Sequence, residues 1–228
     1  MSTVVLCGSL GSTREMWEPQ LPALAEHDVV RIDHPGHGGE PLEDFEDVGD
    51  LARRVLDRVD APTFSFVGLS LGGAIGMRLA LDAPERLGRL VLACTAARFA
   101  EPAFWHERAA TVRAGGIEAI ADAVVGRWFT PAFADVSRYR EMLLSTDREG
   151  YARCCDALAR FDVRDELRAV AAPTLVVAGA DDPSTPPEQG ALIAERIPGA
   201  RFEILAPAAH LANVERAAAF NDLLREHL

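Results

Sequence analysis

Short apolar runs rich in β-branched residues alternate along the chain with stretches whose apolar residues recur at helical spacing. Several of these runs are apolar at consecutive positions, as expected for parallel strands covered on both faces. Strands alternating with helices predict an α/β fold with a doubly wound, mostly parallel sheet. The predicted strands are 3–7, 29–32, 63–67, 89–94, 174–179 and 201–205. The predicted helices lie near 17–26, 44–59, 70–82, 187–196 and 213–227.

Residues 98–168 interrupt this alternation. They contain no convincing strand pattern but several amphipathic helical patterns, such as the one at 116–128. We therefore expect an all-helical cap at 98–168 that covers one edge of the sheet. The core would then consist of residues 1–97 and 169–228.

The composition narrows the possible partners and chemistry. A length of 228 residues fits one domain, or one domain with a sizeable insertion. The formal net charge of −12 makes nucleic acid or an anionic membrane a poor partner. All 23 basic residues are arginine, which excludes Schiff-base chemistry on lysine and a Walker lysine. No run approaches the roughly 18 apolar residues of a membrane span.

Charge is shared unevenly between the two predicted parts. The cap holds eleven arginines and twelve acidic residues, whereas the rest of the chain holds twelve arginines and 23 acidic residues. An anionic small molecule would therefore meet least repulsion at the cap. A solvated helix surface of Arg and Glu gives the same count, so this pattern alone decides nothing.

The cysteines bear on the compartment. Cys7, Cys94, Cys154 and Cys155 form no C-x-x-C pair, and the vicinal pair cannot easily close a relaxed disulfide. This pattern suits a reducing compartment. The N-terminal residues show neither the basic region nor the long apolar region of an export signal. We therefore expect a cytoplasmic protein.

The pentapeptide G-L-S-L-G at 68–72 matches G-x-S-x-G and stands between a predicted strand and a predicted helix. This context is that of a tight strand-to-helix turn, which strains the serine backbone and exposes its hydroxyl above the sheet. Glycines are needed on either side because neighbouring backbone passes too close for a side chain. Ser70 is therefore the candidate nucleophile. The pentapeptide alone, without its strand and helix, would also fit a glycine-rich turn in which the serine only caps the helix.

A serine nucleophile needs a base, and the base needs an acid to orient it. Hydrolases with this turn carry the acid and the histidine later in the chain, each after a strand. Asp181 and Asp182 follow the strand 174–179, and His210 follows the strand 201–205. We favour Asp182 because it precedes Pro183 in the loop; Asp181 could instead cap the turn.

Two backbone donors are expected to stabilise an oxyanion. The N–H of Leu71 lies at a helix N-terminus, and the small residues after the first strand let the N–H of Ser9 or Leu10 approach a carbonyl oxygen. The sequence does not choose between Ser9 and Leu10.

The sequence context of the other histidines indicates structural or surface roles. We expect hydrogen-bonding roles for His34 and His37, a solvated helix position for His106, and helix ends at the surface for His27 and His227. No His, Asp or Glu cluster has the spacing of a metal site, so no metal is expected.

The serine turn, the later aspartate and histidine loops and several other segments of the chain resemble the α/β-hydrolase superfamily and, more narrowly, its 3-oxoadipate enol-lactonase family. The resemblance covers almost the whole chain. G-x-S-x-G is shared with very many hydrolases, whereas M-W-E-P-Q, R-W-F-T-P and G-Y-A-R-C are more particular to the lactonases. The matching segments are 9–21, 33–38, 68–73, 127–133, 150–158, 179–187 and 208–215.

The resemblance implies a cofactor-free serine hydrolase with Ser70, Asp182 and His210 as catalytic residues. Its substrate would be 3-oxoadipate enol-lactone, a small anionic lactone of aromatic catabolism, and its product 3-oxoadipate. The substrate carboxylate needs a positive partner, for which arginine is suited. Arg127 is the first candidate and Arg98 the second, although either could lie in a surface ion pair. Trp128 could wall the pocket or pack the cap.

Two departures from the lactonases bear on these expectations. Family members usually have a pair of strands before the one at 3–7, and without it a sheet edge could be exposed or pair with another subunit in a homo-oligomer. The loop at 33–38 also lacks an arginine that the lactonases more often have. The alternatives are a related carboxylesterase, a C–C bond hydrolase acting on another small acid, or a non-catalytic ligand receptor on the same scaffold.

Overall fold

A six-stranded parallel sheet forms the centre of the computed structural model, which describes residues 2–228. The strand order is β2-β1-β3-β4-β5-β6, and every neighbouring pair is parallel. The α/β fold predicted from the sequence is confirmed. The strands are β1 (Thr3–Cys7), β2 (Asp28–Ile32), β3 (Phe64–Leu69), β4 (Leu87–Ala93), β5 (Thr174–Gly179) and β6 (Arg201–Leu205).

Burial along each strand follows its place in the sheet. Every residue of β5 is buried, whereas the edge strands β2 and β6 each bury only their last residue, Ile32 and Leu205. Central parallel strands are covered on both faces and therefore need apolar side chains at consecutive positions. This explains the unbroken apolar runs in the sequence.

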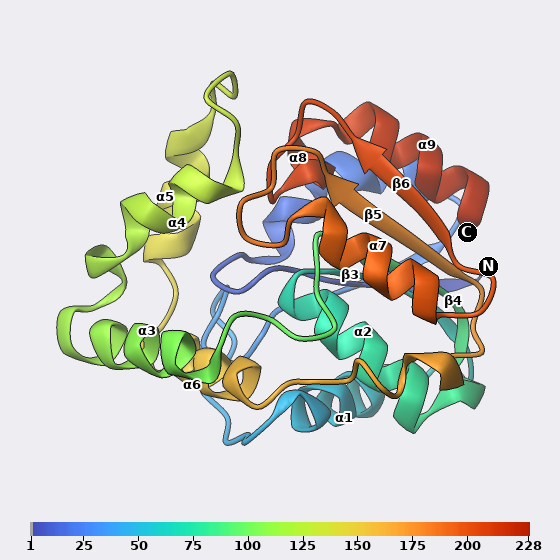
Figure 1. Ribbon diagram of the computed structural model, residues 1–228, viewed down its shortest axis with the longest axis horizontal. Coiled ribbons are helices and arrows are strands. Elements are labelled where there is room, and N and C mark those ends of the chain that lie inside the picture. Colours follow the sequence, from blue (N-terminus) through green and yellow to red (C-terminus); the bar gives the residue numbers. More distant parts are fainter. Residues whose placement is uncertain (1) are drawn as a thin grey trace.

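Helices cover both faces of the sheet (Figure 1). On one face lie α1 (Val48–Arg58), α2 (Leu71–Asp82) and α7 (Pro187–Arg196). On the other lie α8 (Ala212–Glu215) and α9 (Ala217–His227), which pack against the 3₁₀ helix Arg14–Leu24. Short 3₁₀ helices also occur at Pro84–Arg86, Ile117–Ala119 and Leu167–Ala169.

Some helix boundaries differ from the expected ones for local reasons. The segment expected at 17–26 is a 3₁₀ helix, because Pro19 and Pro22 inside it lack the N–H that an α-helical ladder needs. The helix expected from 44 begins at Val48, since Asp47 caps it through a reciprocal bond pattern with Asp50. In residues 2–228 no helix is both long and apolar enough to cross a membrane.

A group of four helices between β4 and β5 covers one end of the sheet, away from the two termini (Figure 1). Within it α3 packs along α6 and α4 along α5. The chain leaves and re-enters the core at one place, where the N–H of Val163 donates to the carbonyl of Ala97 at 2.9 Å. These cap helices are α3 (Pro102–Gly115), α4 (Ala121–Trp128), α5 (Val136–Leu144) and α6 (Arg148–Ala159).

Candidate active site

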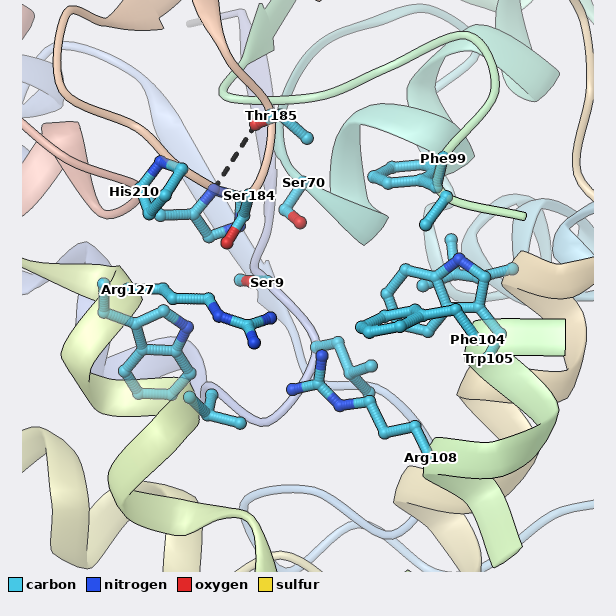
Figure 2. Close-up of a pocket in the computed structure, with 16 residues that line it drawn as sticks. Ser9, Ser70, Phe99, Phe104, Trp105, Arg108, Arg127, Ser184, Thr185 and His210 are labelled. Atoms are coloured by element: carbon cyan, nitrogen blue, oxygen red, sulfur yellow. Dashed lines mark hydrogen bonds between the residues drawn. The ribbon is translucent and has the colours of Figure 1, made fainter. Parts of the chain in front are cut away.

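Ser70 lies in the sharp turn between β3 and α2. Its backbone has φ 58° and ψ −113°, which residues other than glycine rarely adopt. Hydrogen bonds hold this conformation on both sides: the N–H of Ser70 donates to Ala93 at 2.9 Å, and Thr95 Oγ1 donates to the carbonyl of Ser70 at 2.8 Å. The turn directs the hydroxyl of Ser70 into a cavity (Figure 2).

The glycines beside Ser70 allow the backbone to approach closely. A Cβ atom on Gly68 would lie 2.2 Å from the carbonyl oxygen of Gly72. A Cβ atom on Gly72 would lie 2.0 Å from the carbonyl oxygen of Cys7. Both distances are far below van der Waals contact, so no other residue fits at either position without moving the backbone. The expected close approach of neighbouring backbone at the two glycines is confirmed.

Asp182 and His210 form a buried pair. His210 Nδ1 lies 2.8 Å from Asp182 Oδ2, and the residues are only 4% and 3% exposed. A carboxylate accepts, so Nδ1 carries the proton and Nε2 is left free to accept one. Asp182 also accepts a bond from Thr185 Oγ1 at 2.7 Å and bonds from the backbone N–H groups of Ser184 and Thr185.

These contacts determine the charge of Asp182. Burial by itself would raise the pKa of Asp182, but the neighbouring His210 and the hydrogen bonds from Thr185 outweigh it and hold the pKa below its ordinary value. Asp182 is therefore a carboxylate at neutral pH and can orient the imidazole. Asp181 is exposed instead, and its N–H donates to the carbonyl of Ala208.

The residues expected to form the oxyanion hole surround Ser70. Ser9 and Leu10, in the loop after β1, both line the cavity, whereas Leu71 is not among its lining residues. Leu71 directly follows Ser70 as the first residue of α2, where helix geometry leaves the N–H without an intrahelical acceptor. The role of these N–H groups as oxyanion donors stays a prediction.

His34 and His37 hold the loop that carries Ser9 and Leu10. His37 Nε2 accepts from the N–H of Gly11 at 3.1 Å, and its Nδ1 donates to a neighbouring carbonyl. His34 Nε2 donates to the carbonyl of Gly8 at 2.9 Å. The predicted structural role of both histidines is confirmed. Burial lowers the pKa of His34 to about 3 and that of His37 to about 4, so both are neutral at physiological pH.

The cavity has a volume of about 250 Å³ and lies between the core and the cap helices (Figure 2). Hydroxyl groups and the imidazole lie on the core side, and aromatic rings and two guanidinium groups come from the cap. Its main lining residues are Ser70, Ser184, Thr185, His210, Phe99, Phe104, Trp105, Trp128, Arg108 and Arg127.

The predicted substrate-binding residues differ in where they lie. Arg127 and Trp128, at the end of α4, both line the cavity. Arg98 is not among the lining residues, because its guanidinium lies 2.7 Å from Glu101 and 4.0 Å from Asp162 at the base of the cap. Arg98 therefore does not reach the cavity, and the structure does not support the substrate-binding role that the sequence suggested for it.

Arg108 lines the cavity but was not predicted from the sequence as a site residue. It comes from α3, on which it follows Trp105 by one helical turn, and both residues face the cavity (Figure 2). The spacing of an arginine three residues after a large aromatic was the available signal. It could not be used, because the sequence did not reveal which face of this helix turns toward the core.

Glu215, on α8, connects the cap to the loop that carries His210. Its carboxylate accepts bonds from the N–H of Thr130 at 3.1 Å and from the N–H of Ala209 at 2.9 Å. It also accepts a bond from the Thr130 hydroxyl. Thr130 belongs to the cap and Ala209 to the core, so one side chain holds the two parts together.

The backbone reinforces this connection. The N–H of Leu211 donates to the carbonyl of Trp128 at 2.9 Å, and the N–H of His210 donates to that of Arg127 at 3.4 Å. The end of α4 thus lies alongside the histidine loop, and Arg127 is fixed relative to His210.

The remaining histidines lie outside the cavity. His106 is half-exposed and lies 3.1 Å from Asp156, in agreement with the expected solvated position. His227 was expected at the surface; it is buried instead, and its Nε2 donates to the carbonyl of Leu90 at 3.1 Å. Within residues 2–228, no group of three or more His, Cys, Asp or Glu side chains could hold a metal ion.

A serine on a strained turn that shares a cavity with the histidine of a buried His–Asp pair is typical of carboxylic-ester hydrolases. Comparisons with known proteins agree, and the protein is a carboxylic-ester hydrolase. The family model described as "alpha/beta hydrolase fold" matches residues 2–217, and the chain belongs to this family.

Individual relatives include the enol-lactonases suggested by the sequence. The chain is 36% identical to 3-oxoadipate enol-lactonase 2 of Acinetobacter baylyi, over 96% of this chain and 85% of that protein. It is similar to the crystal structure of the enol-lactonase from Burkholderia xenovorans, with a TM-score of 0.95, 37% identity, and coverage of 99% of this chain and 90% of that chain. A thermophilic esterase from Thermogutta terrifontis, solved with malate bound, gives a TM-score of 0.91 at 28% identity, over 99% of this chain and 89% of that chain.

Proposed function

We propose that the protein hydrolyses 3-oxoadipate enol-lactone to 3-oxoadipate, a reaction of aromatic catabolism by the β-ketoadipate pathway. The observation that carries this proposal is a small cavity whose lining includes Ser70, His210 and Arg127. An ester carbonyl and a carboxylate on one small molecule match the serine and the arginine. The named enol-lactonases among the relatives support the same substrate.

In this mechanism Ser70 Oγ attacks the ring carbonyl as His210 Nε2 takes its proton. Asp182 keeps the proton of His210 on Nδ1 and stabilises the imidazolium that forms. The N–H of Leu71, with that of Ser9 or Leu10, donates to the oxyanion. The ring C–O bond then breaks as His210 gives the proton to the leaving oxygen, which departs as an enol that becomes the ketone.

Water completes the reaction. His210 removes a proton from a water molecule, which attacks the acyl-serine and releases the acid while Ser70 regains its proton. The step from enol to ketone is favourable and draws ring opening forward. No cofactor is required.

Arg127 binds the substrate carboxylate in this proposal, and Trp128 forms part of the pocket wall. An arginine suits this role because its planar fork can bind both carboxylate oxygens. The malate in the related Thermogutta terrifontis esterase is also a small carboxylate ligand. All four cysteines of the chain are free and buried, which fits a reducing compartment, so we place the enzyme in the cytoplasm.

The test is the ultraviolet absorbance of freshly generated 3-oxoadipate enol-lactone in the presence of the wild type, Ser70→Ala and Arg127→Gln. We expect the wild type to remove the absorbance, Ser70→Ala to leave it, and Arg127→Gln to raise KM more than it lowers kcat. A wild type that cleaves p-nitrophenyl acetate but not the lactone would keep the esterase and disprove the substrate.

A further inference from the structure

Two arginines in the cavity have no acidic partner. In residues 2–228, no carboxylate lies within 4.0 Å of the guanidinium of Arg108 or Arg127. This differs from much of the cap, where six arginines are ion-paired in a chain with a net charge of −12. The paired ones are Arg98, Arg113, Arg138, Arg140, Arg153 and Arg164.

Arg108 is held in place by stacking on two aromatic rings. Its guanidinium lies over the ring of Trp105, at 5.6 Å from the centroid, and over that of Tyr151, at 5.5 Å. Its Nε is buried and pairs with no acceptor among residues 2–228. A guanidinium held by stacking at the wall of a cavity, with no carboxylate beside it in residues 2–228, is suited to an anionic ligand.

A second cavity adjoins the first at these arginines. It has a volume of about 230 Å³, lies between α3 and α4, and shares Phe104, Arg108, Val124 and Arg127 with the catalytic cavity. Ile120 and Ala123 give it an apolar wall, and Glu107 and Thr111 also line it. The two guanidinium groups therefore lie at the boundary between the space around Ser70 and this second space.

The two arginines approach from different sides (Figure 2). Arg127 reaches in beside His210 and Ser184, whereas Arg108 reaches in from α3, beside Phe104 and Trp105. A ligand acylating Ser70 would meet Arg127 on the side of the histidine and Arg108 on the side of the aromatic rings.

We propose that Arg108 is a second carboxylate-binding residue, and that it gives the enzyme a further activity on monoesters of longer straight-chain dicarboxylic acids. A short acid chain places its carboxylate on Arg127. A longer chain extends instead toward the aromatic side, along the apolar walls that the two cavities share, and places its carboxylate on Arg108. This inference rests on the proposed attack by Ser70, but it does not depend on the identity of the lactone.

The reaction is an ordinary ester hydrolysis. The bond from Ser70 Oγ to the acyl carbon forms as the ester C–O bond breaks, and the proton passes through His210 to the departing alcohol. Water then cleaves the acyl-serine, so the ester and one water give an alcohol and a dicarboxylic acid. No oxidant or other reactant is needed.

The test uses a pH-stat and the monomethyl esters of succinate, adipate and suberate, with dimethyl suberate as the uncharged counterpart. In Arg108→Gln we expect KM for monomethyl suberate to rise roughly tenfold or more, while KM for monomethyl succinate and dimethyl suberate stays unchanged. Arg127→Gln should show the reverse order, with the larger rise for monomethyl succinate. Arg98→Gln, an equivalent change outside the cavity, is the matched control and should behave as the wild type.

Arg108→Lys separates a role in binding from one in packing. Lysine keeps the charge and the stem but loses the planar fork, so its KM for monomethyl suberate should lie between those of the wild type and Arg108→Gln. An equal rise in KM for charged and uncharged suberate esters, in either variant, would overturn the proposal. So would a wild type with no preference for monomethyl over dimethyl suberate.

The outcome is separable from that of the proposed function. A wild type that hydrolyses monomethyl suberate in the expected way but leaves the enol-lactone intact disproves the lactone and keeps the site at Arg108. A wild type that opens the enol-lactone but ignores the charge on the suberate esters does the opposite.

Discussion

At the scale of single residues, the site depends on a strained backbone at Ser70 that its neighbours hold in place. A non-glycine residue in such a conformation costs about 1–3 kcal/mol. Ser70 keeps this conformation because its backbone is hydrogen-bonded to Ala93 and Thr95. The lack of side chains at Gly68 and Gly72 leaves room for the tight turn. The exposed hydroxyl is thus a product of the turn and its surroundings.

The first prediction concerns Gly72. Adding a methyl group in Gly72→Ala forces the turn away from the carbonyl of Cys7, so we expect the free energy of unfolding to fall by about 1–3 kcal/mol or more and esterase activity to be lost. Gly126→Ala is the matched control, because Gly126 lies in α4 with open space around its Cβ position. It should stabilise the protein by up to about 1 kcal/mol. Urea denaturation measures the change in unfolding free energy in each variant, and an esterase assay measures the activity. Equal unfolding free energies in the two variants would contradict this explanation of the motif.

The second prediction separates the two neighbouring aspartates. Asp182→Asn removes the carboxylate that orients His210 and should lower kcat by about 10⁴, as expected when the imidazole is held in the wrong tautomer. Asp181→Asn changes an exposed residue and should leave kcat unchanged. Steady-state hydrolysis of p-nitrophenyl acetate measures both. A large loss in Asp181→Asn, with little in Asp182→Asn, would reverse the assignment.

At the scale of elements, the cap and the core meet at the histidine loop. Glu215 accepts from Thr130 of the cap and Ala209 of the core, and the end of α4 lies alongside His210 and Leu211. The position of α4 decides where Arg127 points. The placement of the substrate and that of the base are therefore linked through this contact.

The third prediction tests this link. In Glu215→Gln one carboxylate oxygen becomes an NH₂ group that faces a backbone N–H, which leaves a donor unsatisfied at a cost of about 1–3 kcal/mol. We expect kcat to fall and KM for the charged ester to rise together, with KM for a neutral ester changing less. Glu195→Gln, on the exposed side of α7, is the control. A lower melting temperature with unchanged KM for the charged ester would show that Glu215 is only structural.

Much of this fold could be predicted because its determinants are local. Central strands need apolar side chains on both faces, and the turn at Ser70 needs glycines at fixed distances, so both leave a pattern in the sequence. The position of the cap on the core leaves none. It depends on contacts such as that between Thr130 and Glu215, which lie 85 residues apart. For this reason Arg98 was considered and Arg108 was missed.

At the scale of the whole molecule, stability is coupled to pH through buried neutral histidines. Burial lowers the pKa of His34 to about 3 and of His37 to about 4, from an ordinary value of 6.5. Between pH 6.5 and pH 4 the unfolded chain therefore binds protons that the folded chain does not. The contribution of these two histidines to the free energy of unfolding therefore falls as the pH is lowered through this range.

The fourth prediction gives this effect a size. Two histidines of this kind contribute a slope of up to about 2.7 kcal/mol per pH unit. Urea denaturation at pH 7 and pH 5 measures it, and His37→Gln should reduce the slope by up to about 1.4 kcal/mol per pH unit because one titrating group is gone. A slope that His37→Gln leaves unchanged would mean that His37 takes up its proton in the folded protein over the same pH range as in the unfolded chain.

The most direct measurement is the labelling of the protein with a fluorophosphonate, followed by mass spectrometry of the peptide that spans residues 59–78. We predict one label per chain, located on Ser70 rather than on Ser65 of the same peptide, and loss of esterase activity in proportion to labelling. Ser70→Ala should take up no label. A fully active enzyme that stays unlabelled, or a label on another residue, would contradict the assignment of Ser70 as the nucleophile and with it the proposed mechanism.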